Sequence, residues 1–182
     1  MVQGRGVDAS LNETGRTQAD KVFHHLREVS FDVVYTSALV RTHQTAKGFI
    51  DAGIPHRVHD GFDEISWGSQ EGVEATTEAK TLYARTVQSW QDGKLHLNVG
   101  GGESPIQVME RQKVAMQEVL DFEGSTILVC MHGRALRVLL CWLLNHSLRY
   151  MDGFPHDNCA YYKLTYRGDF VIEEFNVKEH LT

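Results

Sequence analysis

The sequence has no excess of positive charge, and this absence restricts its partners. Its 182 residues include 18 Lys and Arg against 24 Asp and Glu, a formal net charge of −6. Surfaces that bind nucleic acids or anionic membranes are normally basic. The composition therefore argues against a nucleic-acid partner and against an anionic membrane surface. Any phosphate site in this chain has to be local.

Cysteine and long apolar runs are also scarce. The three cysteines form no CxxC pair, and Cys130 and Cys141 lie in apolar runs. An odd count without such pairs is typical of a reducing compartment. The apolar run at 136–144 is too short to cross a bilayer, and the polar start does not resemble a signal peptide. We therefore expect a cytoplasmic protein without a membrane partner.

Metal-ligand spacings are missing as well. His24 and His25 lie on a predicted helix, where at least one of them faces water. His56 and His59 lie in an extended segment, on opposite faces. Neither pair has a third ligand at a standard spacing, so we expect no metal and no other cofactor.

What the sequence does contain is an alternation of helical and strand-like segments. Apolar residues at helical spacing predict one helix at about 14–28 and others that Ser37 and Ser104 can cap. In the helix after Ser104, Met116 and Leu120 are expected to face the core, together with Ile106 and Met109.

Short apolar runs predict strands at 31–35 and 126–131, and a hairpin turning at Arg167-Gly168-Asp169 ends the chain. This order predicts one domain over residues 1–182, in three α/β/α layers with a largely parallel central sheet. The stretch from 71 to about 90 is mostly helical and precedes a glycine run, NVGGGES, so we interpret it as a mobile cover.

The most informative stretch is ILVCMHGRALRVLLCW at 127–142. His132 and Gly133 stand where a buried strand becomes a helix, a junction that collects free backbone N–H groups and suits an anion. An ionisable side chain in this place favours a functional role. Arg134 and Arg137, which follow, are expected to be charges on the helix surface, although Arg134 could reach the pocket.

Three other polar residues or pairs occupy similar places beyond predicted strands: Gln3-Gly4, Arg41 and Glu64. An arginine offers a planar fork to phosphate oxygens, a histidine can stabilise or accept a phosphoryl group, and a carboxylic acid can protonate a leaving oxygen. Taken alone, Arg41 and Glu64 would each be read as ordinary surface charges. Together with His132, they indicate phosphoryl transfer without a metal.

These residues belong to segments that resemble the histidine phosphatase superfamily, also called phosphoglycerate-mutase-like. QGRGVDASLNETGRTQA is similar to the family pattern QG..D..L...G..QA, and DVVYTSALVRTHQTA to D.VY.S.L.R..QTA. FDEISWGSQEG resembles L.EI.FG..EG, and GGES and a strand ending in HG follow in order. Five ordered segments cover nearly the whole chain, which makes the resemblance specific.

The resemblance implies roles and partners. Arg41 would clamp the phosphoryl group, His132 would stabilise its charge, and Glu64 would be the general acid. Gln3, Gly4 and Gly133 would contact the substrate, Gly133 through a close backbone approach. The expected ligand is a small phosphorylated substrate or inorganic phosphate, and a homodimer stays open.

One departure concerns the family's Arg-His-Gly motif, which ends the first strand and precedes the QG segment. No Arg-His pair precedes Gln3 in this chain. We therefore expect that the first strand and the nucleophilic histidine are missing from this sequence, and that the chain is inactive or impaired without them.

Only 38 residues separate Glu64 from Glu103. The resemblance implies a larger insertion for the glycolytic mutases, so this spacing favours a phosphatase that works through a phosphohistidine intermediate. Three alternatives stay open: phosphoglycerate-mutase-type phosphoryl transfer, a non-catalytic protein that binds a phosphate ligand, and a scaffold that only kept the fold.

Overall fold

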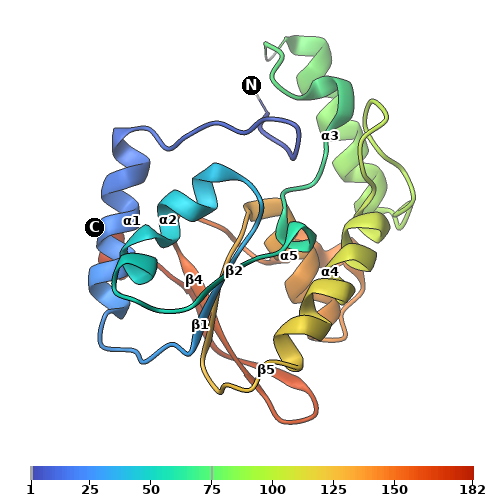
Figure 1. Cartoon of the computed structure of the whole chain (residues 1–182). Helices are drawn as coiled ribbons and strands as arrows, with labels where there is room; N and C mark the ends of the chain where they lie inside the picture. Colours follow the sequence, from blue (N-terminus) through green and yellow to red (C-terminus); the bar gives the residue numbers. More distant parts are fainter. Residues whose placement is uncertain (1, 75) are drawn as a thin grey trace.

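The computed structural model describes residues 2–74 and 76–182 (Figure 1). Among these residues, no helix is long and apolar enough to span a bilayer. The α-helices are α1 Glu13–Leu26, α2 Val40–Asp51, α3 Thr77–Gln91, α4 Pro105–Leu120 and α5 Gly133–Leu143. The strands are β1 Val33–Thr36, β2 His56–Val58, β3 Ile127–Cys130, β4 Tyr161–Tyr166 and β5 Phe170–Val177, and short 3-10 turns occur at η1 Asp60–Phe62, η2 Gly68–Gln70, η3 Leu148–Gly153 and η4 Glu179–Leu181.

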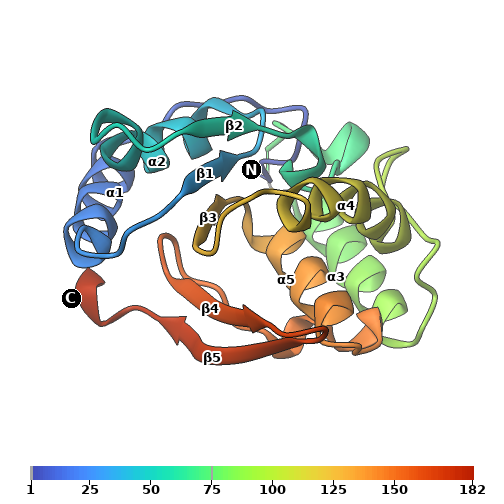
Figure 2. The ribbon, with the colours of Figure 1, turned by 60° about the horizontal axis from the view of Figure 1, so that its bottom comes forward.

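A parallel sheet in the order β2-β1-β3 lies between two layers of helices (Figure 2). Val34 of β1 packs with Phe49 of α2 on one face. On the other face, Val33 and Tyr35 pack with α4 and α5. Alternate residues of β1 thus pack against helices on opposite faces of the sheet, as expected for a strand buried on both faces. The predicted three-layer α/β/α architecture is confirmed.

The predicted hairpin is present as the antiparallel pair β4-β5, which forms a sheet of its own. In the described part of the chain, β3 has β1 as its only strand partner, and β4 has only β5. The residues of β3 are only partly buried, whereas Val33, Val34 and Tyr35 of β1 are 0% exposed. β3 therefore has one edge whose backbone makes no strand pairing.

Two expectations about helix starts have different outcomes. Ser104 caps α4 as predicted, in a reciprocal pair with Gln107 that forms a capping box. Ser37 does not cap α2, because the N-cap residue is Leu39 and the Ser37 hydroxyl is turned toward His132 instead.

The buried face of α4 differs from the expected one. Met116 is buried as predicted, but Leu120 is 41% exposed. The reason is that the buried stripe follows Val108, Gln112, Ala115 and Val119, a helical repeat that turns Leu120 toward solvent.

The glycine run packs closely against the loop at 66–69. A Cβ placed on Gly102 would lie 2.2 Å from the Ser66 carbonyl oxygen and 2.6 Å from the Gly68 amide nitrogen. In the same segment, Trp90 of α3 is 1% exposed and donates from Nε1 to the Leu97 carbonyl at 2.8 Å. The glycine run thus holds the end of this segment against the loop at 66–69, and the Trp90 bond joins α3 to the residues that follow it.

We expect Gly102→Ala to lower the free energy of unfolding by about 1–3 kcal/mol, since backbone atoms have to move to admit the methyl group. Gly153→Ala is the matched control, because a Cβ there meets nothing within 4 Å. Its effect should stay within about 0.5 kcal/mol. Urea unfolding measures both values, and equal stability of the two variants would contradict the close packing.

Candidate active site

Arg41 and His132 meet at the carboxyl ends of β1 and β3. Because both strands are parallel, the segments that follow them leave the same edge of the sheet. Arg41 lies in the first turn of α2, and His132 is the N-cap residue of α5. Arg41 donates from Nε to Nδ1 of His132 at 3.1 Å. The structure thus places together two of the residues expected from the sequence.

The remaining donors of Arg41 hold the N-terminal loop. Its Nη1 donates to the Val7 carbonyl at 2.7 Å, and its Nη2 to the Gly4 carbonyl at 3.3 Å. A guanidinium has five N–H donors, and the described residues accept from three of those of Arg41, so one on each terminal nitrogen is left for a ligand. Donors on two neighbouring nitrogens can each reach an oxygen of a phosphate.

The bond from Arg41 fixes the tautomer of His132. Nδ1 accepts a hydrogen bond, so the neutral ring carries its proton on Nε2, which donates to the Ser37 hydroxyl at 2.8 Å. Burial lowers the pKa of His132 to about 3, and the positive charge of Arg41 acts in the same direction. The imidazole is therefore neutral near pH 7, with both of its ring nitrogens engaged.

Glu64 reaches the same place from the loop after η1. Its Oε1 accepts from the amides of Ile65 and Ala135, both at 2.9 Å, and its Oε2 accepts from the amide of Arg134 at 3.1 Å. The Glu64 carboxylate therefore occupies the start of α5, where the sequence predicted a binding site for an external anion. It also lies near Arg41. Among the neighbouring charges, that of Glu64 does most to raise the pKa of this arginine.

Burial raises the pKa of Glu64, and its three backbone hydrogen bonds oppose that rise. A carboxyl group with a raised pKa is better suited to hold a proton and donate it. From the described residues, Oε1 accepts two bonds, whereas Oε2 accepts only one. Oε2 is therefore the oxygen with room for a proton.

Gln3 and Gly4 of the N-terminal loop, which were both expected to contact the substrate, lie in different surroundings in the structure. Gln3 is exposed, whereas Gly4 is buried and uses its carbonyl to hold Arg41. A Cβ on Gly4 would lie 2.3 Å from Oε1 of Glu71. The Glu71 carboxylate also accepts from the amides of Gly6 and Trp67, and so fixes this loop against the loop of Glu64.

Gly133 is close to a side chain that the sequence did not indicate. A Cβ on Gly133 would lie 2.7–2.9 Å from three atoms of the His156 ring. The space over this glycine, which was expected to admit an anion, thus holds an imidazole.

The prediction that Arg134 and Arg137 are surface charges is wrong. Arg134 is 9% exposed and binds Asp152 and the Tyr83 hydroxyl, with its guanidinium over the Trp90 ring of α3. Arg137 is partly buried and donates to the same Asp152 carboxylate at 3.1 Å. Helical periodicity alone could not reveal that η3 and α3 cover this side of α5.

A network of charged groups supports the loop of Glu64. Arg111 of α4 binds Glu103 through two bonds, at 2.8 and 3.1 Å, and donates to the Glu64 carbonyl at 3.1 Å. Arg5 lies 3.0 Å from Asp63, whose other oxygen accepts from the Ala38 amide. Sequence reasoning missed these residues, since a charge carries no local signal of its distant partner.

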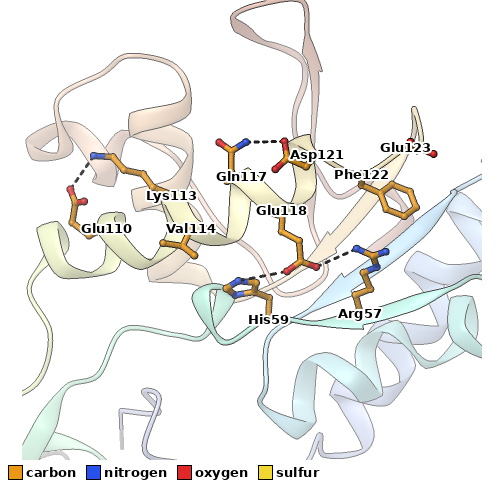
Figure 3. Close-up of a pocket in the computed structure, with 10 residues that line it drawn as sticks. All are labelled: Arg57, His59, Glu110, Lys113, Val114, Gln117, Glu118, Asp121, Phe122 and Glu123. Carbon is orange, nitrogen blue, oxygen red and sulfur yellow. Dashed lines mark hydrogen bonds and ion pairs between the residues drawn. The ribbon is translucent and has the colours of Figure 1, made fainter.

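A separate hollow of about 960 Å³ lies between β2 and α4 (Figure 3). Its charged side chains pair with one another, as in Lys113 with Glu110 and Arg57 with Glu118. It includes none of Arg41, Glu64 and His132. Among the described residues, in this hollow as in the rest of the molecule, no three His, Cys, Asp or Glu side chains gather as metal ligands.

Comparisons with known proteins agree with this arrangement. The chain is 29% identical over 157 residues to phosphoserine phosphatase 1 of Hydrogenobacter thermophilus, covering 85% of this chain and 74% of that protein. It is 28% identical over 191 residues to a probable phosphoglycerate mutase of Yersinia enterocolitica, covering 100% and 87%.

A mycobacterial glucosyl-3-phosphoglycerate phosphatase, solved with inorganic phosphate, has the same fold. Its TM-score is 0.86 at 22% identity, and the match covers 100% of this chain and 93% of that one. The sequence profile of the histidine phosphatase superfamily, branch 1, matches residues 1–178. The chain therefore belongs to the histidine phosphatase superfamily, an enzyme family.

Proposed function

We propose that the protein is a phosphatase of a small phosphomonoester that works through a phosphohistidine intermediate. The observation that carries the proposal is the direct contact of Arg41 with His132 at the carboxyl edge of the sheet, beside the buried carboxyl of Glu64. These groups can bind a phosphoryl group, stabilise its charge and protonate a leaving alcohol. Two relatives are named as a phosphoserine phosphatase and a probable phosphoglycerate mutase. These names support the same class of reaction, the transfer of a phosphoryl group from a phosphate ester.

In the proposed reaction, the two free N–H groups of Arg41 hold two phosphoryl oxygens. A histidine nitrogen forms a bond to phosphorus while the bond from phosphorus to the ester oxygen breaks. Oε2 of Glu64 donates its proton to that oxygen as the alcohol leaves. Water then attacks phosphorus and gives a proton to the Glu64 carboxylate, the nitrogen–phosphorus bond breaks, and inorganic phosphate is released.

His132 is not suited to be the nucleophile, because both of its nitrogens take part in hydrogen bonds. A nucleophile needs a free nitrogen in line with the breaking bond. We propose that this role belongs to a histidine in an Arg-His-Gly segment on a strand that pairs with the free edge of β3. The 182-residue chain by itself would then turn substrate over slowly.

A second candidate is a protein that binds a phosphate ligand without catalysis. The observation that favours it is the same engagement of both His132 nitrogens. The fork of Arg41 would bind phosphate equally well in either case, so turnover by a chain that carries the added histidine separates the two functions.

The proposal also covers the cellular compartment and the partners of the protein. The cysteines are free thiols in the structure, and the net charge is −6, which supports a cytoplasmic protein that binds small anions rather than nucleic acid. A homodimer stays an alternative to a monomer, and the mass of the particle in solution decides between them.

We expect Arg41→Ala to weaken the binding of inorganic phosphate by about 10-fold or more, since it removes charge-assisted hydrogen bonds. Arg41→Lys keeps the charge without the fork and should bind with intermediate affinity. Titration calorimetry on the 182-residue chain measures the dissociation constants, with Arg149→Ala as an exposed control. Equal affinity of the parent and Arg41→Ala would contradict the proposed site.

A further inference from the structure

Ser37 contacts the ring nitrogen of His132 that does not face Arg41. It follows β1 directly, is 0% exposed, and its hydroxyl lies 2.8 Å from Nε2 of His132. The backbone of Ser37 is held on two sides, because its amide donates to the Cys130 carbonyl at 3.3 Å and His43 donates to its carbonyl at 2.9 Å. The Ser37 oxygen is therefore fixed in place, while the hydrogen on it can still rotate.

The hydrogen bonds of the Ser37 hydroxyl have determined directions. Its oxygen accepts from Nε2 of His132 and from the Leu39 amide, at 2.8 and 3.1 Å. A hydroxyl has two acceptor positions and one hydrogen, so Ser37 gives its hydrogen to Oγ1 of Thr42, at 2.9 Å. Thr42 in turn donates to the Leu39 carbonyl at 2.9 Å. With the bond from Arg41 to Nδ1, all these bonds run one way, from the guanidinium to the backbone at the start of α2.

In this arrangement, the N–H of the neutral His132 ring points away from the proposed phosphate site. The proton is on Nε2, which faces the buried hydroxyl of Ser37. Nδ1 faces Arg41, whose two remaining N–H groups are the proposed phosphate donors. A ring that stabilises a phosphoryl group by donating to it needs its proton on the nitrogen nearer that group. When phosphate is bound, the proton is therefore needed on Nδ1, and Nε2 then needs a donor of its own.

The alternative is a His132 ring that carries two protons. Burial and the positive charges of Arg41 and Arg111 lower the pKa of His132 to about 3, which disfavours the charged ring near pH 7. Exchange of one proton between the two nitrogens leaves the ring neutral. Ser37 suits such an exchange, because a hydroxyl can donate to Nε2 as well as accept from it. The carboxylate or backbone carbonyl that often faces a histidine could only accept.

We propose that Ser37 is a positioning residue that lets His132 change the nitrogen that carries its proton when a phosphoryl group binds. In the bound state, Nδ1 donates to a phosphoryl oxygen, the Nε of Arg41 is released from Nδ1, and Ser37 donates to Nε2 instead of to Thr42. The ring gives its Nε2 proton to solvent water and receives another proton on Nδ1, so its charge stays zero. This inference rests on the proposed function, since it concerns the same phosphate site.

The first test reads the protonated nitrogen from ¹⁵N spectra of the imidazole rings. The 182-residue chain with ¹⁵N-labelled histidine is measured near pH 7, without phosphate and with saturating inorganic phosphate, and His132→Gln identifies the signals of His132. The proton should be on Nε2 in the free protein and on Nδ1 in the complex. A complex with the proton still on Nε2, or with both nitrogens protonated, would overturn this inference alone. A chain that binds no phosphate would refute the proposed function as well.

Thr42→Val gives a second test, with a sign that a purely structural role would not produce. Thr42 accepts from Ser37 only in the free state, whereas its bond to the Leu39 carbonyl is common to both states and cancels. The loss of this hydroxyl therefore destabilises the free state alone. It should tighten the binding of inorganic phosphate by about 2-fold to 10-fold, the effect expected of one hydrogen bond. Titration calorimetry measures the dissociation constants.

Two variants accompany Thr42→Val. Thr42→Ser keeps the hydroxyl and should restore the affinity of the parent. Thr86→Val removes a buried hydroxyl of α3 that bonds to the Leu82 carbonyl, and it should leave the affinity unchanged. Equal or weaker binding by a folded Thr42→Val would overturn the inference. If this variant does not fold, the spectra of the parent decide the question.

Discussion

A chain extended before Met1 by an apolar strand ending in Arg-His-Gly is expected to hydrolyse a small aryl phosphate at least ~10³-fold faster than the 182-residue chain. Removal of a nucleophile from enzymes with covalent intermediates costs at least this factor. The added strand would pair with the free edge of β3 and deliver a histidine beside Arg41. Initial rates of both chains, together with trapping of a labelled phosphohistidine, measure the effect.

A second extension that ends in Arg-Gln-Gly separates folding from chemistry. It should raise the melting temperature as much as the first, because it satisfies the same backbone groups of β3. Its turnover should stay at the level of the 182-residue chain. If the chain without any extension is as fast as the one with Arg-His-Gly, the assigned roles are mistaken, and His132 or another residue is the nucleophile.

In the extended chain, Glu64→Gln should slow the hydrolysis of an alkyl phosphate by about 10²-fold to 10⁴-fold, the usual contribution of a general acid. An alkoxide leaves poorly unless it is protonated, whereas a nitrophenolate leaves readily without help. The same variant should therefore slow a nitrophenyl phosphate much less. The kcat values of the two esters give the comparison.

Glu78→Gln is the control for this measurement, since Glu78 is exposed on α3 and distant in sequence from the loop of Glu64. Glu64→Gln also replaces the acceptor of the Arg134 amide by an amide group, so its melting temperature has to be recorded beside its rate. An equal loss of rate with both esters would show that Glu64 supports the structure and does not donate the proton.

The sequence alone predicted the layers and most of the elements, because burial on both faces leaves a strong pattern. The run at 127–130 is apolar throughout, and Ser104 with Gln107 forms a local capping signal. The side of α4 occupied by Leu120 was predicted wrongly. When a helix has apolar residues on several sides, its sequence pattern does not show which side packs against the sheet.

For the site, the sequence could predict which residues gather but not what each of them bonds to. Arg41 and His132 follow parallel strands, and topology alone brings such residues to one edge. Glu64 at the start of α5, and His156 over Gly133, depend on loops whose course no local pattern encodes. Catalytic roles stay proposals for the same reason, since a role depends on geometry at the level of single atoms.

The two outer strands of the parallel sheet protect their edges differently. β2 is short and carries Arg57, a charge that discourages pairing with another chain. β3 offers Ile127, Leu128, Val129 and Cys130 without any charge, beside an unpaired backbone. Such an edge is a template for aggregation. Self-association of the 182-residue protein should therefore increase with concentration, and light scattering against dilution would measure the range in which it remains monodisperse.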